Sequence, residues 1–454
     1  MTPTKTSLYE FFLQYAAERG NDTFLFDETE TFTVAESFAA ICSMANTLTT
    51  CGVKVGDLVG VRAHRSIETV LIFFALQFIG AVAVMHDPRE PVEETISFID
   101  GVLCVGGTEI VVHADKKFAG FDYSNVDVEA ASIVVFTSGS TGVRKGVMLS
   151  QYNFVNNSVD TRGIGGYCDD DICMLIVPMC HVFGIALVVT AVVNRHSVFI
   201  PSSLDAEHLL RCIVRYGVTR LNGVPSTYIA LAENKGETEI SSLRCGLIGG
   251  GPYTTKSFIF VEQTLGLKLI PVYGMSECVG ISCASVNDSI EQRCEGVGKV
   301  YSMNELRLLD DEILVKSPAR AVGYMGEPPF DKNSWLHTGD LGKLDENGTL
   351  HIVGRKKDII IRNGNNLSVA EIERKIATID GVKRVCVVAV PDEKQGEVPC
   401  ALVVANNPIE DNFSEVLQRN EIPACVKYVA TIPLTTTGKP DKQAIVKMFE
   451  KQQI

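Results

Sequence analysis

The sequence lacks the segments that direct a chain into or across a membrane. Its first twelve residues, MTPTKTSLYEFF, are mixed and polar, so they predict no cleavable signal. The longest apolar run, VLIFFALQFIGAVAVM at 70–85, contains Gln77 and is shorter than the roughly 18 residues of a membrane span. We expect instead a buried helix that breaks at Gly80 into a strand, in a cytoplasmic protein with no membrane span.

The chain also lacks an excess of positive charge and a cysteine framework. Its net charge of −14 argues against nucleic acid or an anionic membrane as the main partner, so an anionic ligand would need a local basic pocket. The fourteen cysteines include no C-x-x-C pair, and without a secretory segment they predict reduced thiols. Cys180 stands beside His181, but no second ligand pair at zinc spacing accompanies them, which argues against a metal site there.

The 454 residues suffice for two or three folding units and contain no repeat. Through about the first 300 residues, strand-length apolar runs such as DICMLIVPM and LRCGLIGGG alternate with helix-compatible sequence, which predicts an α/β fold with buried sheets. Beyond them the strands shorten, and Glu346-Asn347-Gly348 predicts a hairpin turn. The segment after GRKKD at 354–358 predicts a second, small α+β domain, and GRKKD itself is either a hinge or a solvated linker.

One polar cluster, in FTSGSTGVRKGVMLS at 136–150, follows a predicted buried strand. Its glycines allow backbone N–H groups to approach a ligand, its hydroxyls add donors and its lysine adds charge, a combination that suits a polyphosphate. These residues are Thr137, Ser138, Gly139, Ser140, Thr141, Gly142, Lys145 and Gly146. The stretch fits neither the Walker loop nor the G-x-S-x-G nucleophile elbow. A turn that merely reverses the chain is the alternative.

Further polar groups follow other strands. LIGGGP places Gly249, Gly250 and Gly251 at a strand end, where a flat ring could lie against backbone, and VYGMSE offers the aromatic Tyr273 and the carboxylate Glu277. LHTGD ends in Asp340, a candidate partner for ribose hydroxyls, and PLTTTGKPDK exposes Lys439 on a glycine turn. Taken singly, each also fits a structural role as a core aromatic, a cap, a turn residue or a solvated lysine.

Taken together, TSGSTGVRKG, GGGP, YGMSE, HTGD, GRKKD and TTTGK resemble the acyl-adenylate-forming enzymes in order and spacing over nearly the full chain. That superfamily comprises acyl-CoA synthetases, luciferases and peptide-synthetase adenylation domains. The resemblance implies a large N-terminal domain of stacked β-sheets flanked by helices, 1–354, and a small mobile C-terminal domain, 355–454, that turns near Lys357. It implies that ATP converts a carboxylic acid to acyl-AMP and that a thiol, coenzyme A first, then takes the acyl group.

The resemblance also implies roles for single residues. The loop from Thr137 through Ser138, Gly139, Ser140, Thr141 and Gly142 to Lys145 would bind the β- and γ-phosphates. The remaining positions divide among the other parts of ATP and the acid. They are Gly249, Gly250 and Gly251 for the wall of the adenine and acyl pockets, Tyr273 and Gly274 for adenine, Ser276 for the α-phosphate, Glu277 for Mg²⁺, Asp340 and Arg355 for ribose, Lys439 for the reacting carboxylate and α-phosphate, and His181 for the acyl pocket. Ser276 replaces the threonine usual in the family and keeps its hydroxyl. His181 could instead be a core histidine.

The branch within the superfamily is less sharply indicated. PMCHVFG has no Phe-Asp pair and is closer to the CoA-ligase and aryl-acid branches, which favours a hydrophobic acid over an α-amino acid. The GGGP stretch resembles the o-succinylbenzoate–CoA ligases, whereas GKPDK is nearer the carrier-loading enzymes. The alternatives are therefore a stand-alone enzyme that loads an acid onto a carrier protein's phosphopantetheine, and an idle homologue that serves as a binding module. Intact Lys145, Glu277, Asp340 and Lys439 argue against the latter.

Overall fold

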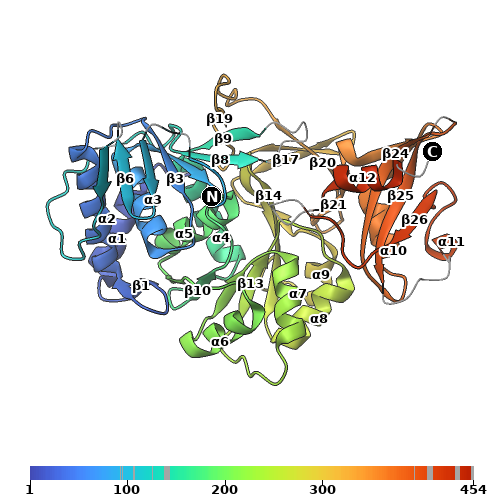
Figure 1. Cartoon of the computed structure of the whole chain (residues 1–454), viewed down its shortest axis with the longest axis horizontal. Helices are drawn as coiled ribbons and strands as arrows, with labels where there is room; N and C mark the ends of the chain where they lie inside the picture. Colours follow the sequence, from blue (N-terminus) through green and yellow to red (C-terminus); the bar gives the residue numbers. More distant parts are fainter. Residues whose placement is uncertain are drawn as a thin grey trace. The chain divides into compact units, whose positions relative to one another are not determined.

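The chain folds into two compact units, described here from a computed structural model (Figure 1). The structure describes residues 1–92, 94, 96–105, 108–124, 126–137, 144–392, 394–405, 413–434 and 440–450. The first unit comprises Met1–Glu305 and Lys316–Leu336, and the second comprises Leu306–Val315 and His337–Ile454.

The first unit contains a sheet whose centre is parallel. Its strands, in spatial order, are β16 (Lys299–Val300), β15 (Cys278–Cys283), β14 (Lys268–Met275), β13 (Cys245–Ile248), β12 (Arg220–Asn222), β10 (Ile172–Leu175), β11 (Ser197–Phe199), β1 (Thr23–Phe26) and β2 (Thr31–Thr33). From β14 to β1 every neighbouring pair is parallel, and antiparallel strands close both edges. Such a centre is buried on both faces, which explains the continuous apolar runs in the sequence.

A second sheet of the same unit carries the strands around the serine- and glycine-rich loop. Its order is β19 (Gly323–Tyr324), β9 (Lys145–Leu149), β8 (Ile133–Thr137), β4 (Val82–His86), β3 (Leu58–Arg62), β5 (Ile96–Ile99), β6 (Val102–Val105) and β7 (Thr108–Val111). Strand β4 is parallel to β8, whereas β8 and β9 form an antiparallel hairpin. The predicted strand before the polar cluster is therefore β8.

Helices cover both sheets and share one apolar core with them. They are α1 (Leu8–Arg19), α2 (Val34–Thr50), α3 (Ile67–Ile79), α4 (Gln151–Ile164), α5 (Val182–Asn194), α6 (Ala206–Tyr216), α7 (Pro225–Asn234), α8 (Thr255–Leu265) and α9 (Ile290–Glu295). Every residue of α3 except Glu68 is buried, as expected of a helix that is apolar on all sides. It ends at Gly80, whose φ of 73° stops the helix before β4, as the sequence predicted.

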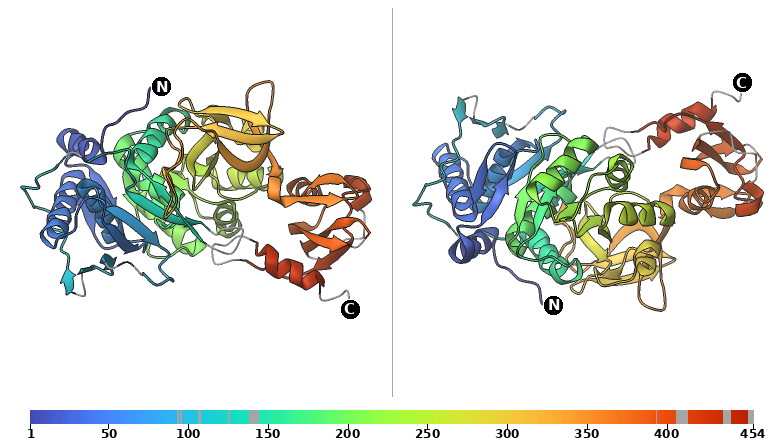
Figure 2. Two further views of the ribbon diagram at one scale, coloured as in Figure 1. Left: turned by 90° about the horizontal axis from the view of Figure 1, so that it is seen from above. Right: turned by 90° about the horizontal axis from the view of Figure 1, so that it is seen from below.

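The second unit is built from two smaller sheets. One has the order β17 (Glu305–Leu309), β18 (Glu312–Lys316), β20 (Leu336–Leu344) and β21 (Leu350–Arg355), and the other has β23 (Asn365–Ser368), β22 (Ile359–Arg362), β25 (Gly396–Ala405) and β24 (Val382–Asp392), with β26 (Cys425–Tyr428) also on β25. Two of its helices, α10 (Val369–Ile376) and α12 (Lys442–Glu450), pack on β24 and are visible from two sides in Figure 2; α11 (Phe413–Val416) completes the unit. The predicted hairpin is confirmed between β20 and β21.

This α/β architecture, with large sheets in the first unit and a smaller α+β unit after them, confirms the predicted fold class. By packing, residues 306–315 and 337–354 belong to the second unit, whereas the sequence prediction placed them in the first domain. Packing does not report where a chain rotates, so the boundary at 354 and the hinge near Lys357 stay predictions. Lys357 lies exposed in a short 3₁₀ turn, Lys356–Asp358.

Candidate active site

Predicted site residues gather at one edge of the first sheet. Strands β10, β12, β13 and β14 are parallel, so their carboxyl ends meet at the same edge. His181 follows β10, Gly249 follows β13, and Tyr273 lies near the end of β14. Ligands of open α/β sheets bind in the crevice outside such strand ends. The topology therefore brings together the stretches predicted for the acid and for adenine.

The glycine run after β13 lies closely against its neighbouring strand. A Cβ atom added to Gly249 would be 2.8 Å from Val272 Cγ2 and 3.0 Å from the Val272 carbonyl oxygen, so the backbone approach leaves no room for a side chain. Gly250 has a φ of 75°, which L-residues rarely adopt. Gly249 therefore lies directly against the strand that carries Tyr273, which places the glycine run beside the residue predicted to stack on adenine.

Ser276 and Glu277 form the two-residue turn between β14 and β15. Met275 pairs with Cys278 directly below the turn, and a Cβ on Gly274 would be 2.4 Å from the Val279 carbonyl oxygen. The hairpin is thus too tight for a side chain at Gly274, and the turn fixes the positions of both polar residues. Ser276 and Glu277 are half-buried, so their oxygen atoms remain reachable from solvent.

The loop predicted to bind phosphate joins β8 to β9. Its two ends are paired, with Thr137 opposite Lys145, and the Thr137 hydroxyl donates to the Lys145 carbonyl oxygen at 3.5 Å. Beside it, Arg144 forms an ion pair with Glu90, which ties the loop to the stretch after β4. Ser138, Gly139, Ser140, Thr141 and Gly142 lie outside the described residues, so the structure fixes the base of the loop.

Tyr324 connects Lys145 to Glu277. The Lys145 ammonium lies 4.5 Å from the centre of the Tyr324 ring, and the Tyr324 hydroxyl donates to Glu277 Oε1 at 2.8 Å. Strand β19 places the tyrosine there, because Tyr324 pairs with Val147 on β9. Tyr324 thus contacts both Lys145, the predicted phosphate-binding lysine, and Glu277, the predicted metal ligand, and no direct ion pair joins these two described side chains.

The surroundings of Tyr324 determine the protonation state of its phenol. Partial burial, together with the neighbouring Glu277 carboxylate, raises the pKa of the Tyr324 phenol. The phenol therefore stays protonated at neutral pH and donates a hydrogen bond to Glu277. Lys145 also contacts Glu327 at 3.2 Å, but both side chains are about half exposed (49% and 51%). Such surface pairs contribute only about 0–1 kcal/mol, so an incoming phosphate could displace Glu327.

His181 lies where the edges of the two sheets meet. Asp87 directly follows β4 of the second sheet, and the Arg89 guanidinium donates two hydrogen bonds to it, at 2.8 and 2.6 Å. These bonds lower the pKa of Asp87 to about 2, and His181 is near enough to add to the shift. His181 is half-buried at the N-terminal end of α5, so it is not a fully buried core histidine, and its place at the mouth of an acyl pocket stays a prediction.

In the second unit, Asp340 and Arg355 contact each other. They are paired across β20 and β21, and Arg355 Nε lies 2.8 Å from Asp340 Oδ1. The Asp340 side chain is 5% exposed and that of Arg355 is 48% exposed, so the arginine holds an almost buried carboxylate from the solvent side. The structure thus brings the two predicted ribose residues together. Lys439 lies outside the described residues.

Glu312 organises the segment around Asp340 and was missed by the sequence analysis. Its carboxylate accepts from the Gly339 amide at 3.2 Å and from Lys356 Nζ at 3.0 Å, and lies 3.2 Å from His337 Nδ1. Burial alone would raise its pKa, but the Lys356 and His337 contacts lower it. Glu312 therefore stays ionised and fixes both the turn before Asp340 and the start of the GRKKD stretch. An acidic residue in DDEILV gives no sign of this in the sequence.

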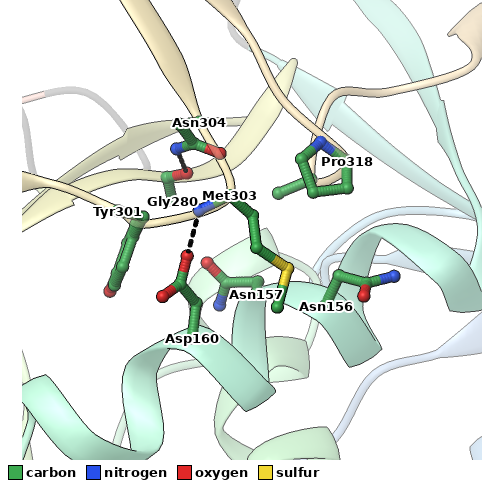
Figure 3. A pocket seen from close by; sticks show the side chains of 9 residues that line it. Asn156, Asn157, Asp160, Gly280, Tyr301, Met303, Asn304 and Pro318 are labelled. Atoms are coloured by element: carbon green, nitrogen blue, oxygen red, sulfur yellow. Dashed lines mark hydrogen bonds between the residues drawn. The ribbon is translucent and has the colours of Figure 1, made fainter. Parts of the chain in front are cut away.

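A small hollow between α4 and β15 does not belong to this site. Figure 3 shows Asp160 accepting from the Met303 amide at 2.9 Å and Asn304 donating to the Gly280 carbonyl at 3.0 Å across it. The described atoms around the hollow leave no room for a water-sized sphere. It is a packed contact between layers and cannot hold an organic acid.

The known proteins that this chain resembles decide its family. The AMP-binding enzyme family matches residues 12–100 and 102–326, and the AMP-binding enzyme C-terminal domain matches residues 371–439. The chain belongs to the AMP-binding enzyme family. The predicted superfamily is confirmed.

Curated relatives agree with this assignment. The 2-succinylbenzoate–CoA ligase of Bacillus mycoides (strain KBAB4) is 30% identical over 458 residues, which cover 93% of this chain and 95% of the relative. The 2-succinylbenzoate–CoA ligase of Bacillus cereus (strain Q1) is 29% identical with the same coverage. Together with the family, they confirm the prediction of an ATP-dependent, AMP-forming acid–thiol ligase.

Solved structures share the fold. ATP-bound MatB from Rhodopseudomonas palustris superposes with a TM-score of 0.86 at 23% identity, covering 98% of this chain and 99% of that one. The o-succinylbenzoate coenzyme A synthetase MenE from Bacillus subtilis, in complex with ATP and a magnesium ion, gives a TM-score of 0.81 at 24% identity, covering 95% and 98%. Among the described helices of this chain, none combines the length and apolar character that crossing a bilayer demands.

The Tyr324 contact gives a testable prediction. Tyr324→Phe keeps the ring beside Lys145 but removes the donor that orients Glu277. Loss of a hydrogen bond behind a metal ligand typically weakens metal binding by about 10–100-fold. We expect the Mg²⁺ concentration for half-maximal pyrophosphate exchange to rise by that factor, with a smaller change in the KM for the acid.

Tyr216→Phe is the matched control, because it removes a phenol from helix α6 of the same unit. It should leave the Mg²⁺ dependence as in the wild type. A Tyr324→Phe enzyme with a wild-type Mg²⁺ curve would show that the phenol does not position Glu277 for the metal.

Proposed function

We propose that this chain ligates 2-succinylbenzoate, or a closely related aryl acid, to coenzyme A. The observation that carries the proposal is the 30% identity to a 2-succinylbenzoate–CoA ligase along 95% of that relative's length. The half-buried His181 at the meeting edges of the sheets and the apolar α5 behind it support a hydrophobic aryl pocket.

The reaction would proceed in two displacements. An oxygen of the substrate carboxylate attacks the α-phosphorus of ATP, and the bond to pyrophosphate breaks, giving acyl-AMP. The thiol sulfur then attacks the acyl carbonyl carbon and AMP leaves, while the thiol proton passes to solvent or to a base. Charge develops on phosphate oxygens in the first step and on the carbonyl oxygen in the second, so fixed positive groups would accelerate both.

The large unit would bind the polyphosphate and adenine. Thr137 and Lys145, with the loop between them, would contact the β- and γ-phosphates, and Tyr273 would stack on adenine beside the glycine run at 249–251. Glu277 fits a magnesium ligand, because it is a half-buried carboxylate oriented by a hydrogen bond and is not neutralised by a direct lysine pair. The bound ion would neutralise charge on the phosphates, and Ser276 beside it would contact the α-phosphate.

The small unit would contribute the ribose contacts and the lysine that contacts the reacting groups. Asp340, held by Arg355, would accept from both ribose hydroxyls, and Lys439 would bridge the acid and the α-phosphate. Because the family matches both parts of the chain, we further propose that the small unit turns near Lys357 between the two half-reactions. Gly364, in RNGNN, would then face the arm of the incoming thiol.

The direct test is pyrophosphate exchange with a panel of acids. We expect 2-succinylbenzoate to give the highest kcat/KM, with benzoate, medium-chain fatty acids and α-amino acids at least about 10²-fold lower, since missing polar contacts are costly in a buried site. Thioester formation should require free coenzyme A. Preference for an α-amino acid would overturn the choice of substrate. Acyl transfer to a carrier protein's phosphopantetheine but not to coenzyme A would overturn the choice of acceptor.

A second test separates the half-reactions. Lys439→Ala removes one charge aimed at the first transition state and should lower acyl-AMP formation by about 10²–10³-fold. It should still transfer the acyl group from supplied acyl-AMP at near the wild-type rate. Lys357→Pro stiffens the backbone of the hinge and should show the opposite bias, keeping pyrophosphate exchange and losing thioester formation.

Lys447→Ala, an exposed lysine on α12 of the same unit, is the control and should leave both half-reactions unchanged. Equal losses in both half-reactions for Lys439→Ala and Lys357→Pro would reject the two-orientation mechanism.

A further inference from the structure

Three side chains with metal-binding atoms converge on elements that carry none of the predicted nucleotide residues. Glu28 lies in the turn between β1 and β2, and His208 and Cys212 lie on α6. One donor atom of each lies within 4.8 Å of the others. His208 Nε2 is 2.9 Å from Glu28 Oε1, Cys212 Sγ is 3.4 Å from His208 Nε2, and Cys212 Sγ is 3.8 Å from Glu28 Oε1.

The fold brings these residues together in two ways. His208 and Cys212 are four residues apart on one helix, so their side chains lie on the same face. Strands β1 and β11 are parallel, with Phe26 beside Phe199, so the chain leaves both strands at the same edge of the sheet. Glu28 follows the first of these strands, and the segment leading into α6 follows the second.

The spacing of the three atoms matches the edges of a zinc tetrahedron. Bonds of about 2.0–2.1 Å to nitrogen, about 2.0–2.2 Å to oxygen and about 2.3 Å to sulfur place tetrahedral ligands about 3.3–3.6 Å apart. The observed separations of 2.9, 3.4 and 3.8 Å bracket this range. Small side-chain rotations would therefore bring all three atoms to bonding distance of one ion.

The site is also supported and accessible. The Ser202 amide and hydroxyl donate to Glu28 Oε1 at 3.0 and 2.9 Å, and these bonds fix the position of the oxygen that also contacts His208. Asp27 fixes the turn by accepting from the Thr29 amide at 2.7 Å. The Glu28 and His208 side chains are 21% and 23% exposed, so an ion can enter from solvent, while Cys212 forms the buried wall.

We propose that Glu28, His208 and Cys212 bind a zinc-class divalent cation, with water as the fourth ligand. Imidazole and thiolate select this class of metal over Mg²⁺, so the site is separate from the magnesium required for ATP. The metal ion takes the place of the hydrogen bonds that join the three side chains. The Cys212 thiol proton is released to solvent, and His208 binds as the neutral imidazole. The ion would cross-link α6 to the β1–β2 turn.

Zinc and cobalt binding to the full chain test the site. We expect one Zn²⁺ per chain with release of about one proton, and a thiolate-to-metal charge-transfer band when Co²⁺ is used. Cys212→Ser and His208→Gln should each weaken Zn²⁺ binding by more than about 100-fold, because loss of an outer partner alone costs about 10–100-fold. Zn²⁺ should raise the unfolding temperature of the wild type and leave that of both variants unchanged.

The control is Cys51→Ser, a half-buried cysteine at the end of α2, which should bind Zn²⁺ as the wild type does. If Cys212→Ser does not fold, His208→Gln alone decides, because this polar, partly exposed position tolerates an amide. Zn²⁺ affinity unchanged in the variant that folds, or a Co²⁺ complex without a charge-transfer band, would show a hydrogen-bonded cluster and no metal site.

Discussion

The contact of Tyr324 with both Lys145 and Glu277 is the interaction on which the proposed nucleotide site depends. A direct ion pair between this lysine and this glutamate would neutralise both charges. The tyrosine prevents this, because its ring face takes the ammonium and its hydroxyl takes the carboxylate. Lys145 keeps a half-exposed ion pair with Glu327, which an incoming phosphate would displace, and we propose that the ammonium then binds phosphate while the Glu277 carboxylate binds a metal ion. In a chain with a net charge of −14, such local separation of charge is required to bind a polyphosphate.

The sheets supply the geometry that this contact needs. The hairpin of β8 and β9 carries Lys145, the hairpin of β14 and β15 carries Glu277, and the short strand β19 sets Tyr324 in register between them. The buried core beneath these strands makes their ends rigid, whereas the polar residues stand on the connections that leave them. The second unit holds its own polar pair, Asp340 and Arg355, on a similar hairpin, with Glu312 keeping the neighbouring turn in place.

Local sequence patterns predicted most of the fold. The apolar run at 70–85 became α3, a stop at Gly80 and β4, because an apolar helix and a left-handed glycine need no distant partner to be recognised. The turn at Glu346-Asn347-Gly348 was found for the same reason. All fourteen cysteines are free thiols in the structure, including the neighbours Cys400 and Cys425.

The contacts that join distant segments were not predictable. Tyr324 stands in ARAVGYMG, where no periodicity reveals that a two-residue strand will pair with β9. The four-residue spacing of His208 and Cys212 is visible in the sequence, but the approach of Glu28 depends on the pairing of β1 with β11. Strand register over such separations is set by tertiary packing, which single-sequence patterns do not encode.

A double-mutant cycle on Lys145→Met and Tyr324→Leu tests the central contact most directly, with kcat/KM for ATP in pyrophosphate exchange as the readout. If the two side chains act together on the phosphates, the double variant should be less impaired than the product of the single effects, with a coupling energy above about 0.5 kcal/mol. Effects that multiply to within about 0.3 kcal/mol would show that Tyr324 and Lys145 act independently, and would contradict the account.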